Sequence, residues 1–404
     1  MKVVQIDINY QKSSTGKIVE QIHNNLLDEG FDSYVFYGRG EKNKDKNVYK
    51  FSYNVETYFH ALMTRLIGLT GFFSFFSTRR LIKKIKKINP DIVQIHELHA
   101  YFVNYGKLLK FLAKKKYRVY FTFHCEFMYT GKCGHAHDCN KWKTSCGKCP
   151  LLKDYPKSLF FDFTHFMHEH KKKIFKNFDN MTIITPSNWL MGRVQESFLA
   201  NFQQKVIHNG IDHSKFPYMY EEKEGLREEL NIPKDASVVL TLGPNIFTDA
   251  KGGRNLIEIA SLLKDKDIYY IIVGADYSKH NENIIILEKT SNLETLSAYY
   301  SLSDLFFIGS KRENFPTTAL EALSHGTPII GYDSGGTKET APHPYGAFFK
   351  YGNNGEIAEF IKKYKKDRTL LANKEQCLNF ALQEYTNEVM VKNYLNLYKE
   401  GDSR

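Results

Sequence analysis

The sequence predicts an α/β protein made of two doubly wound domains. Short apolar runs alternate with segments of helical periodicity in both halves of the chain, a pattern typical of parallel sheets with helical crossovers. At 404 residues the chain is also too long for one ordinary hydrophobic core. Two sheets, each covered by helices, are therefore expected.

The first half supplies five apolar runs that we interpret as strands, and a helix after the first of them. That helix is expected over Thr15–Glu29, where Ile18, Val19, Ile22 and Leu26 recur at helical spacing. The predicted strands are Val3–Ile8, Ser33–Tyr37, Asp91–Ile95, Val119–Phe123 and Met181–Thr185.

The second half repeats the scheme after a predicted hinge at Val206–Asp212. The polar stretch Glu221–Asp235 indicates a short helix, and longer helices are expected over Leu256–Leu263 and Leu293–Tyr300. The predicted strands are Val238–Leu242, Tyr270–Val273, Ile284–Leu287, Leu305–Ile308 and Pro328–Ile330.

The composition is that of a globular protein, with 42% hydrophobic and 25% charged residues and a net charge of +11. The excess of cations is concentrated at Arg79–Lys87 and Lys107–Arg118. Such runs suit an anionic substrate, an anionic lipid or nucleic acid, but each can equally be a solvated helix face. No apolar run reaches eighteen residues and no signal-peptide pattern opens the chain, so we expect a cytoplasmic protein.

The segment Ser310–Ile330 is the most informative part of the sequence. It sets Glu313 and Glu321 eight residues apart, across a loop that follows the strand Leu305–Ile308 and opens a helix near Pro316. In an open parallel sheet, ligands bind beyond the carboxyl ends of the strands, and a helix N-terminus attracts anions. A phosphate there, together with carboxylates that accept hydrogen bonds from hydroxyl groups, describes a nucleotide sugar.

The same segment resembles the Glu-x7-Glu signature of the retaining glycosyltransferases of family 4, which have the two-domain GT-B fold. The likeness extends to the flanking residues Asn314-Phe315-Pro316-Thr317 and to His325-Gly326-Thr327-Pro328. It implies that Glu313 contacts the donor sugar, that Glu321 contacts the donor ribose, and that Asn314, Phe315 and Thr317 belong to the donor site. Without the flanking residues, two solvated glutamates on a helix would be the simpler interpretation.

The GT-B resemblance implies two Rossmann-like domains that face a central cleft. We expect an acceptor-binding domain over residues 1–205, a nucleotide-sugar-binding domain over 206–385, and a last helix within 386–404 that crosses back to the first domain. The candidate for that helix is Asn387–Lys399.

Two further loops of the second half resemble donor-binding loops of the family. Lys251 lies in a loop that ends in Lys-Gly before a helix and matches the phosphate-binding lysine, with Arg254 as a second cation. Gly335, Gly336 and Glu339 match a Gly-Gly-x-x-Glu loop, although the glycines also suit an ordinary turn that needs positive φ.

Two positions in the first half complete the predicted site. Gly16 lies in a small-residue loop after the first strand, which in the family approaches the leaving pyrophosphate. His124 ends the strand Val119–Phe123 and matches a histidine that faces the donor sugar, with His96 and His99 as rivals. The family usually has Asp after this histidine, where this chain has Cys125, so Glu126 is a candidate substitute.

Four of the six cysteines are concentrated at Cys133, Cys139, Cys146 and Cys149, within an insert at about 125–155. Four thiolates can hold a structural zinc ion, and Cys-x2-Cys is a usual knuckle spacing. His135 or His137 could replace one thiolate, and free cysteines in a long loop are the alternative. A similar Cys-rich insert occurs in a subset of family 4 enzymes. Cys125 and Cys377 are expected to be unpaired.

The aromatic stretch Leu66–Phe76 precedes the first cationic run. An aromatic segment beside cations can lie on an anionic membrane, so the enzyme could associate with the cytoplasmic face. Packing of the phenylalanines into the core is the alternative.

The resemblance implies an enzyme that transfers a sugar from a UDP- or GDP-sugar to a hydroxyl of a glycan or lipid-linked oligosaccharide of a bacterial surface polysaccharide. No Asp-x-Asp pattern marks a metal site, so no cofactor is expected for catalysis. A GT-B-like epimerase or phosphorylase would share the architecture. A basic, zinc-containing nucleic-acid-binding protein is a third alternative, although no recognisable nucleic-acid motif supports it.

Overall fold

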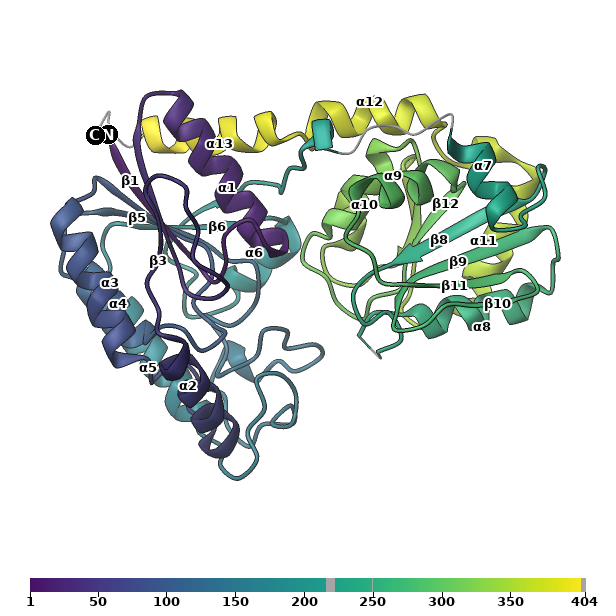
Figure 1. Cartoon of the computed structure of the whole chain (residues 1–404). Coiled ribbons are helices and arrows are strands. Elements are labelled where there is room, and N and C mark those ends of the chain that lie inside the picture. Colours follow the sequence, from purple (N-terminus) through teal and green to yellow (C-terminus); the bar gives the residue numbers. More distant parts are fainter. Residues whose placement is uncertain (216–221, 249, 401–404) are drawn as a thin grey trace. The chain divides into compact units, whose positions relative to one another are not determined.

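The computed structural model describes residues 1–215, 222–248 and 250–400, with the side chains of 222–224 excepted (Figure 1). The chain divides into two compact units. The first contains Met1–His208 together with the chain from Val391 onward, and the second contains Asn209–Met390.

The first unit is built on a parallel seven-stranded sheet of order β3-β2-β1-β4-β5-β6-β7. This order, in which the chain proceeds outward from β1 to β3 on one side and from β4 to β7 on the other, is that of a Rossmann-like fold. The strands are β1 Lys2–Asp7, β2 Asp32–Tyr37, β3 Val48–Lys50, β4 Ile92–Ile95, β5 Arg118–Thr122, β6 Met181–Thr185 and β7 Gln203–Val206.

Helices cover this sheet because each presents an apolar stripe to it. Helix α3, for example, buries Leu81 and Ile85 while every Lys and Arg on it is exposed. The α-helices are α1 Ser13–Asp28, α2 Asn54–Ile67, α3 Phe75–Ile88, α4 Tyr105–Ala113, α5 Thr164–Phe175 and α6 Asn188–Gln195.

The last helix, α13 Asn387–Glu400, packs its C-terminal part on the first unit. The Tyr398 hydroxyl donates to Gln94 Oε1 at 3.0 Å, and the Tyr394 hydroxyl lies 3.0 Å from Thr122 Oγ1. The Arg118 guanidinium donates to the carbonyl of Tyr398 at 2.8 Å. Buried tyrosines thus fix this helix against β4 and β5.

The second unit repeats the architecture with a sheet of order β10-β11-β9-β8-β12-β13-β14, in which only the β10–β11 pair is antiparallel. Its strands are β8 Ser237–Leu242, β9 Ile268–Ala275, β10 Lys279–Asn281, β11 Ile284–Glu288, β12 Leu305–Ile308, β13 Ile329–Tyr332 and β14 Gly346–Phe349. Its α-helices are α7 Glu222–Glu229, α8 Gly253–Leu263, α9 Leu293–Leu302, α10 Thr317–Ser324, α11 Asn354–Lys366 and α12 Lys374–Glu384.

The predicted α/β class with two doubly wound domains is confirmed. The four strands without a predicted counterpart (β3, β7, β10 and β14) are three or four residues long and lie at or near sheet edges, where the apolar signal is weak. Pro316 precedes α10 at the N-cap with extended backbone (φ −68°, ψ 121°), so the predicted helix begins one residue later than expected. The predicted short helix at Glu221–Asp235 corresponds to α7, although Glu221 lies outside the described residues.

Among the described residues, no helix is long and apolar enough to cross a bilayer.

Candidate functional site

Glu313 and Lys251 form an ion pair that lines a small pocket in the second unit. Lys251 Nζ lies 2.7 Å from Glu313 Oε1, and both side chains are partly exposed. Glu313 follows β12 and Lys251 lies in the loop after β8, and these two strands are neighbours in the sheet. The pocket, of about 60 Å³, is lined by both side chains, by the end of β8 and by Gly309 and Ser310. Two residues predicted independently from sequence are thus brought together at the carboxyl end of the sheet.

Backbone contacts fix the loop that carries Glu313. The Gly336 N–H donates to the Glu313 carbonyl at 2.9 Å, and Glu313 forms an isolated parallel bridge with Gly335. Gly335 has a φ of +81°, and a Cβ atom there would lie 2.1 Å from the Glu313 carbonyl oxygen. Gly335 therefore has a structural reason to be glycine, whether or not the loop also contacts a ligand.

The Lys251 loop is held against the same region. Gly252 has a φ of +84°, and a Cβ atom there would lie 2.1 Å from the carbonyl oxygen of Gly309. The Lys311 N–H also donates to the Ala250 carbonyl at 3.0 Å. The lysine and the glutamate are consequently presented by two loops that brace each other.

Glu321 lies on α10 and does not line this pocket. Its Oε2 accepts a hydrogen bond from the Tyr300 hydroxyl at 2.8 Å. The aromatic ring of Tyr300 stacks on His325, whose Nδ1 lies 2.7 Å from the Glu321 carbonyl oxygen. The carboxylate is thereby oriented by a buried tyrosine from α9.

The other predicted donor residues surround these two glutamates with different exposures. Phe315 is buried and packs edge-on against Tyr385 in the core, so only its backbone can face a ligand. Asn314 is buried and Thr317 half-buried at the start of α10, while Arg254 is exposed in the first turn of α8. Glu339 is half-buried, and its carbonyl accepts from the Tyr385 hydroxyl at 3.2 Å.

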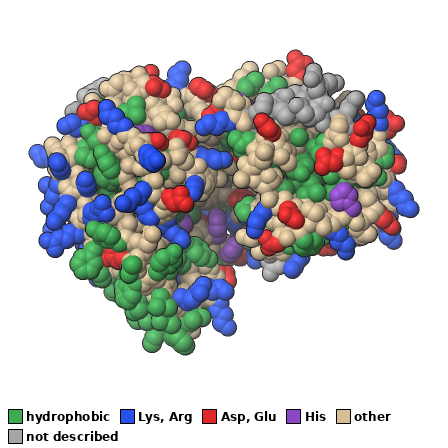
Figure 2. Space-filling model, in the orientation of Figure 1, with side chains coloured by type: hydrophobic (Ala, Val, Ile, Leu, Met, Phe, Trp, Pro, Cys, Tyr) green, Lys and Arg blue, Asp and Glu red, His purple; other side chains and the backbone are tan. Residues whose placement is uncertain are grey.

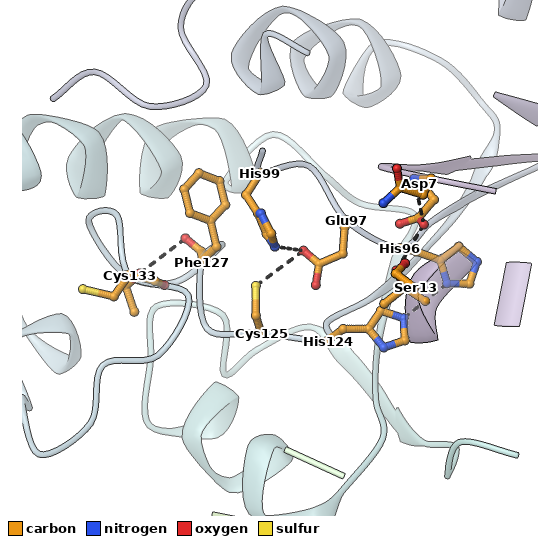
Figure 3. Close-up of polar contacts among 12 residues, drawn as sticks. Asp7, Ser13, His96, Glu97, His99, His124, Cys125, Phe127 and Cys133 are labelled. Carbon is orange, nitrogen blue, oxygen red and sulfur yellow. Dashed lines mark hydrogen bonds and ion pairs between the residues drawn. The ribbon is translucent and has the colours of Figure 1, made fainter. Parts of the chain in front are cut away.

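In the first unit, polar side chains gather where the neighbouring strands β1, β4 and β5 end (Figure 3). His124 Nε2 lies 3.3 Å from His96 Nδ1, and the two rings are stacked. Burial lowers the pKa of both histidines; His124 lowers that of His96 further, whereas for His124 the charge of Glu97 acts against burial and His99 acts with it. Both rings are therefore neutral at pH 7 and can accept as well as donate a hydrogen bond.

Beside them, three side chains from the loops after β4 and β5 converge. Glu97 Oε2 lies 3.1 Å from His99 Nε2 and accepts from the Cys125 thiol at 3.4 Å. Burial opposes the charges, but the pairing lowers the pKa of Glu97 and raises that of His99 well above its usual value. The three ligand atoms all lie within 4.8 Å of one another, so this trio could also hold a metal ion.

Sequence reasoning missed Glu97, which lies between the two histidines that were considered. It proposed Glu126 as the substitute for the family's Asp, and that prediction is wrong. Glu126 is buried and paired with Arg193 Nε at 2.5 Å, and it accepts from the Tyr129 hydroxyl and the Ala136 N–H. The carboxylate beside Cys125 comes from the neighbouring strand, which only the sheet pairing of β4 with β5 reveals.

Asp7, at the end of β1, is a second residue that the sequence did not reveal. It is fully buried, and burial together with the charge of Glu97 raises its pKa to about 7. Its Oδ2 accepts from the Thr15 hydroxyl at 3.2 Å and the Asn9 N–H at 3.3 Å, whereas its buried Oδ1 has no hydrogen-bond partner among the residues that the structure describes. Gly16 lies in the first turn of α1, where a Cβ atom would be 3.3 Å from the backbone of Asn9.

The four clustered cysteines line a single cavity of about 20 Å³ in the insert between β5 and α5. All six cysteines are free thiols. Of the two that were expected to stand apart, Cys125 belongs to the trio with Glu97, and Cys377 is buried in the second unit near the carbonyl of Ala372.

A large apolar surface lies on the first unit, visible as a continuous green area in Figure 2. Phe72 packs into the core against Tyr105, but Phe76 is 74% exposed, so the aromatic stretch is divided between the two predicted environments. The exposed surface includes segments that sequence reasoning did not consider. Its exposed members are Val55, Tyr58, Phe59 and Leu62 of α2, Phe75 and Phe76 of α3, and Leu159, Phe160, Phe161 and Phe166 near the start of α5.

Two protein-family models match the chain and between them span most of it. Residues 15–215 match the model described as Glycosyltransferase Family 4, and residues 222–380 match the model described as Glycosyl transferases group 1. A protein of Escherichia coli strain K12 named for glycosyl transfer in colanic acid biosynthesis, WcaC, is 24% identical over 424 residues, which covers 99% of this chain and all of the relative.

Two further relatives bear on substrate and fold. The N,N'-diacetylbacillosaminyl-diphospho-undecaprenol alpha-1,3-N-acetylgalactosaminyltransferase of Campylobacter jejuni is 28% identical over 199 residues, 47% of this chain and 52% of that protein. The crystal structure of HepE from Anabaena in complex with UDP-glucose superposes with a TM-score of 0.66 at 14% identity, over 99% of this chain and all of HepE, a likeness that concerns the fold alone. The chain belongs to glycosyltransferase family 4 and has the GT-B fold.

Proposed function

We propose that this glycosyltransferase moves a sugar from a UDP-sugar to a hydroxyl of a lipid-linked glycan, with retention of anomeric configuration. The observation that carries the proposal is the Lys251–Glu313 pair in the pocket at the carboxyl ends of β8 and β12. An ammonium and a carboxylate side by side suit a ligand that carries both a diphosphate and sugar hydroxyls.

When the donor binds, the contact between Lys251 and Glu313 can be replaced by contacts of each side chain with the ligand. Lys251 and Glu313 are both partly exposed. A diphosphate can therefore replace the carboxylate as the partner of the ammonium group, at a small desolvation cost for either side chain. Glu313 is then free to accept hydrogen bonds from the sugar hydroxyls. The backbone N–H groups at the start of α10 add positive potential for the leaving phosphate.

The transfer step requires one bond to form and one to break. The acceptor oxygen bonds to the anomeric carbon as the bond from that carbon to the diphosphate oxygen breaks, and the acceptor proton passes to a diphosphate oxygen. This route uses the leaving group as the base, so it includes no covalent sugar–enzyme intermediate. Positive charge from Lys251 makes the diphosphate a better leaving group, and no divalent cation is included in the step.

The first unit contributes a neutral imidazole in this proposal. His124 is held by His96, and its lowered pKa keeps it uncharged, so a neutral imidazole is available for a sugar hydroxyl and does not attract the diphosphate. The carboxyl group of Asp7 and the Glu97–His99 pair provide further donors and acceptors near it.

Relatives guide the choice of substrates. HepE has been crystallised with UDP-glucose, and the name of the Campylobacter relative specifies a sugar acceptor carried on diphospho-undecaprenol. The name of WcaC points to a surface polysaccharide. These names support a UDP-sugar and a polyprenyl-linked acceptor here.

The apolar surface of the first unit supports an acceptor that is anchored in a membrane. The residues of α2 and of 159–166 are adjacent, since the Leu159 N–H donates to the Arg65 carbonyl at 2.8 Å. Helix α3 continues from this surface with six exposed cations, from Arg79 to Lys87. Exposed aromatic residues beside cations match an anionic bilayer, on whose cytoplasmic face we place the enzyme.

Thermal stabilisation by nucleotide sugars tests the donor assignment. We expect UDP-sugars to raise the melting temperature of the wild type more than GDP- or ADP-sugars do, and Glu321→Ala to weaken the effect. Turnover with a polyprenyl-linked acceptor should persist in EDTA. Release of free sugar without an acceptor would favour an epimerase, and the absence of stabilisation by any nucleotide sugar would contradict the proposed donor site.

A further inference from the structure

The insert between β5 and α5 closes around four sulfur atoms. Cys133, Cys139, Cys146 and Cys149 all line the cavity of about 20 Å³, which has room for one particle the size of a water molecule. Trp142, which is buried beside it, donates its indole N–H to the Cys139 carbonyl at 2.8 Å and thereby fixes the turn between the first and second cysteine pairs.

Two further contacts involve these thiols. Cys133 and Cys149 lie close enough to influence each other's protonation. The Gly131 N–H donates to Cys146 Sγ at 3.2 Å. An amide that donates to sulfur stabilises its deprotonated form, the form that binds metal ions.

Two buried lysines flank the same sulfur atoms. Lys132 is 1% exposed, and its ammonium donates only to the carbonyls of Leu152, Asp154 and Pro156. Lys171 is fully buried and donates to the carbonyls of Phe127, Thr130 and Gly131.

Neither ammonium forms an ion pair with a carboxylate in the part of the chain that the structure describes. The thiols of Cys146, Cys125 and Cys133 are the groups that act to raise the pKa of Lys171. Burial lowers the pKa of both lysines, that of Lys171 to about 7, and the neighbouring thiols act in the opposite direction, so negative charge on the sulfur atoms would keep both ammonium groups charged.

We propose that the four cysteines bind one structural zinc ion, and that Lys132 and Lys171 neutralise it. Four thiolates around Zn²⁺ carry a net charge of −2, which the two ammonium groups balance. Each thiol that binds releases a proton to solvent as its Zn–S bond forms, and no redox step is involved.

Side-chain rotation about the Cα–Cβ bonds completes the site. Among the described residues, the three-ligand group with converged donor atoms is Glu97–His99–Cys125, and the four cysteines do not yet meet that distance. That trio is therefore the rival metal position. It differs from the insert because its own charges are already matched by the Glu97–His99 pair.

The zinc ion would fix the loop that carries His124. The Glu126 N–H donates to the Gly134 carbonyl at 2.8 Å, and the Ala136 N–H donates to Glu126 at 2.7 Å, so the insert is attached two residues from that histidine. The proposal is nevertheless independent of the proposed glycosyl transfer, because its test reads metal content.

The test is metal analysis of the full chain purified from zinc-supplemented cells without chelator. We expect about one zinc ion per chain in the wild type, in Cys377→Ser and in Cys125→Ser, and at least a tenfold loss of zinc affinity in Cys146→Ser and Cys149→Ser. Cobalt substitution should give the intense visible bands of tetrahedral thiolate coordination. Far-UV circular dichroism confirms that each variant has folded.

A separate variant tests whether Lys171 neutralises the zinc site. Lys171→Met leaves every sulfur atom in place and should weaken zinc binding at least tenfold, with folding monitored in the same way. Unchanged affinity would refute the neutralisation. Zinc that is lost in Cys125→Ser but retained in Cys146→Ser would assign the metal to the rival trio. Disulfides in the insert, or a reduced wild type that takes up no zinc on reconstitution, would overturn the proposal.

Discussion

Replacing Asp7 by Asn should change the pH dependence of the stability of the first unit between pH 5 and pH 8.5. Asp7 is fully buried, with Oδ2 bonded to Thr15 and Asn9 and Oδ1 without a hydrogen-bond partner among the described residues. Its pKa is raised from 3.8 to about 7, first by burial and then by the charge of Glu97. Asn keeps the shape and can turn its amide oxygen toward the Thr15 and Asn9 donors, but it cannot ionise.

The sign follows from the raised pKa. The folded protein binds the proton of Asp7 more tightly than the unfolded chain does, so the contribution of Asp7 to stability is fully present below pH 3.8 and is lost as the pH rises through about 7. At about 1.36 kcal/mol per pH unit, the whole loss is on the order of 4 kcal/mol. About 2.5 kcal/mol of it lies between pH 5 and pH 8.5.

The assay is urea denaturation followed by tryptophan fluorescence at several pH values in that range. Both tryptophans, Trp142 and Trp189, lie in the first unit, so the signal reports the unit that contains Asp7. The stability of Asp7→Asn relative to the wild type should rise by about 2.5 kcal/mol from pH 5 to pH 8.5. The control Asp276→Asn removes an exposed carboxylate and should show no such trend. A difference between Asp7→Asn and the wild type that stays constant within about 1 kcal/mol across the range would refute the reasoning.

Three further predictions concern the pocket, its loops and the apolar surface. Lys251→Met should weaken UDP-sugar binding about 10- to 100-fold by calorimetry, because a charge-assisted contact is worth about 1.5–3 kcal/mol, whereas Lys289→Met, which breaks an exposed pair, should not. Gly335→Ala should destabilise the second unit by calorimetric melting well beyond Gly352→Ala, since both glycines have a φ of +81° but only Gly335 meets a neighbouring carbonyl; equal losses would contradict this. The double substitution Phe76→Ser and Phe160→Ser should reduce sedimentation with anionic vesicles at least fivefold without changing donor binding, and unaltered sedimentation would remove the membrane assignment.

Local sequence patterns predicted many residues of the candidate site because they mark the ends of strands. The run Leu305–Ile308 is buried on both faces of its sheet, so it reads as continuous apolar sequence, and Glu313 follows it at a predictable edge. The same reasoning placed Lys251 after β8 and His124 after β5. The two loops of the second unit then meet because parallel neighbours β8 and β12 end on the same side.

Local sequence patterns did not predict which distant segments of the chain contact each other. Glu97 lies in a His-Glu-Leu-His sequence, but only the pairing of β4 with β5 puts its carboxylate beside Cys125. Glu126 has the right spacing for a catalytic acid, yet Arg193 from α6 draws it into the interior. A side chain's direction depends on which partner from another element satisfies its charge, and sequence spacing does not encode that partner.

The amino-acid sequence by itself determined the fold class and the two repeated sheets, because periodicity and strand ends are local properties, and the resemblance of its motifs to family 4 singled out Glu313 and Lys251. Tertiary structure alone decided the raised pKa of Asp7, the Glu97–His99–Cys125 cluster, the buried lysines beside the four cysteines and the apolar surface formed by α2 with residues 159–166. Burial and charge pairing are sums over neighbours from several elements, and those neighbours are set only when the chain has folded.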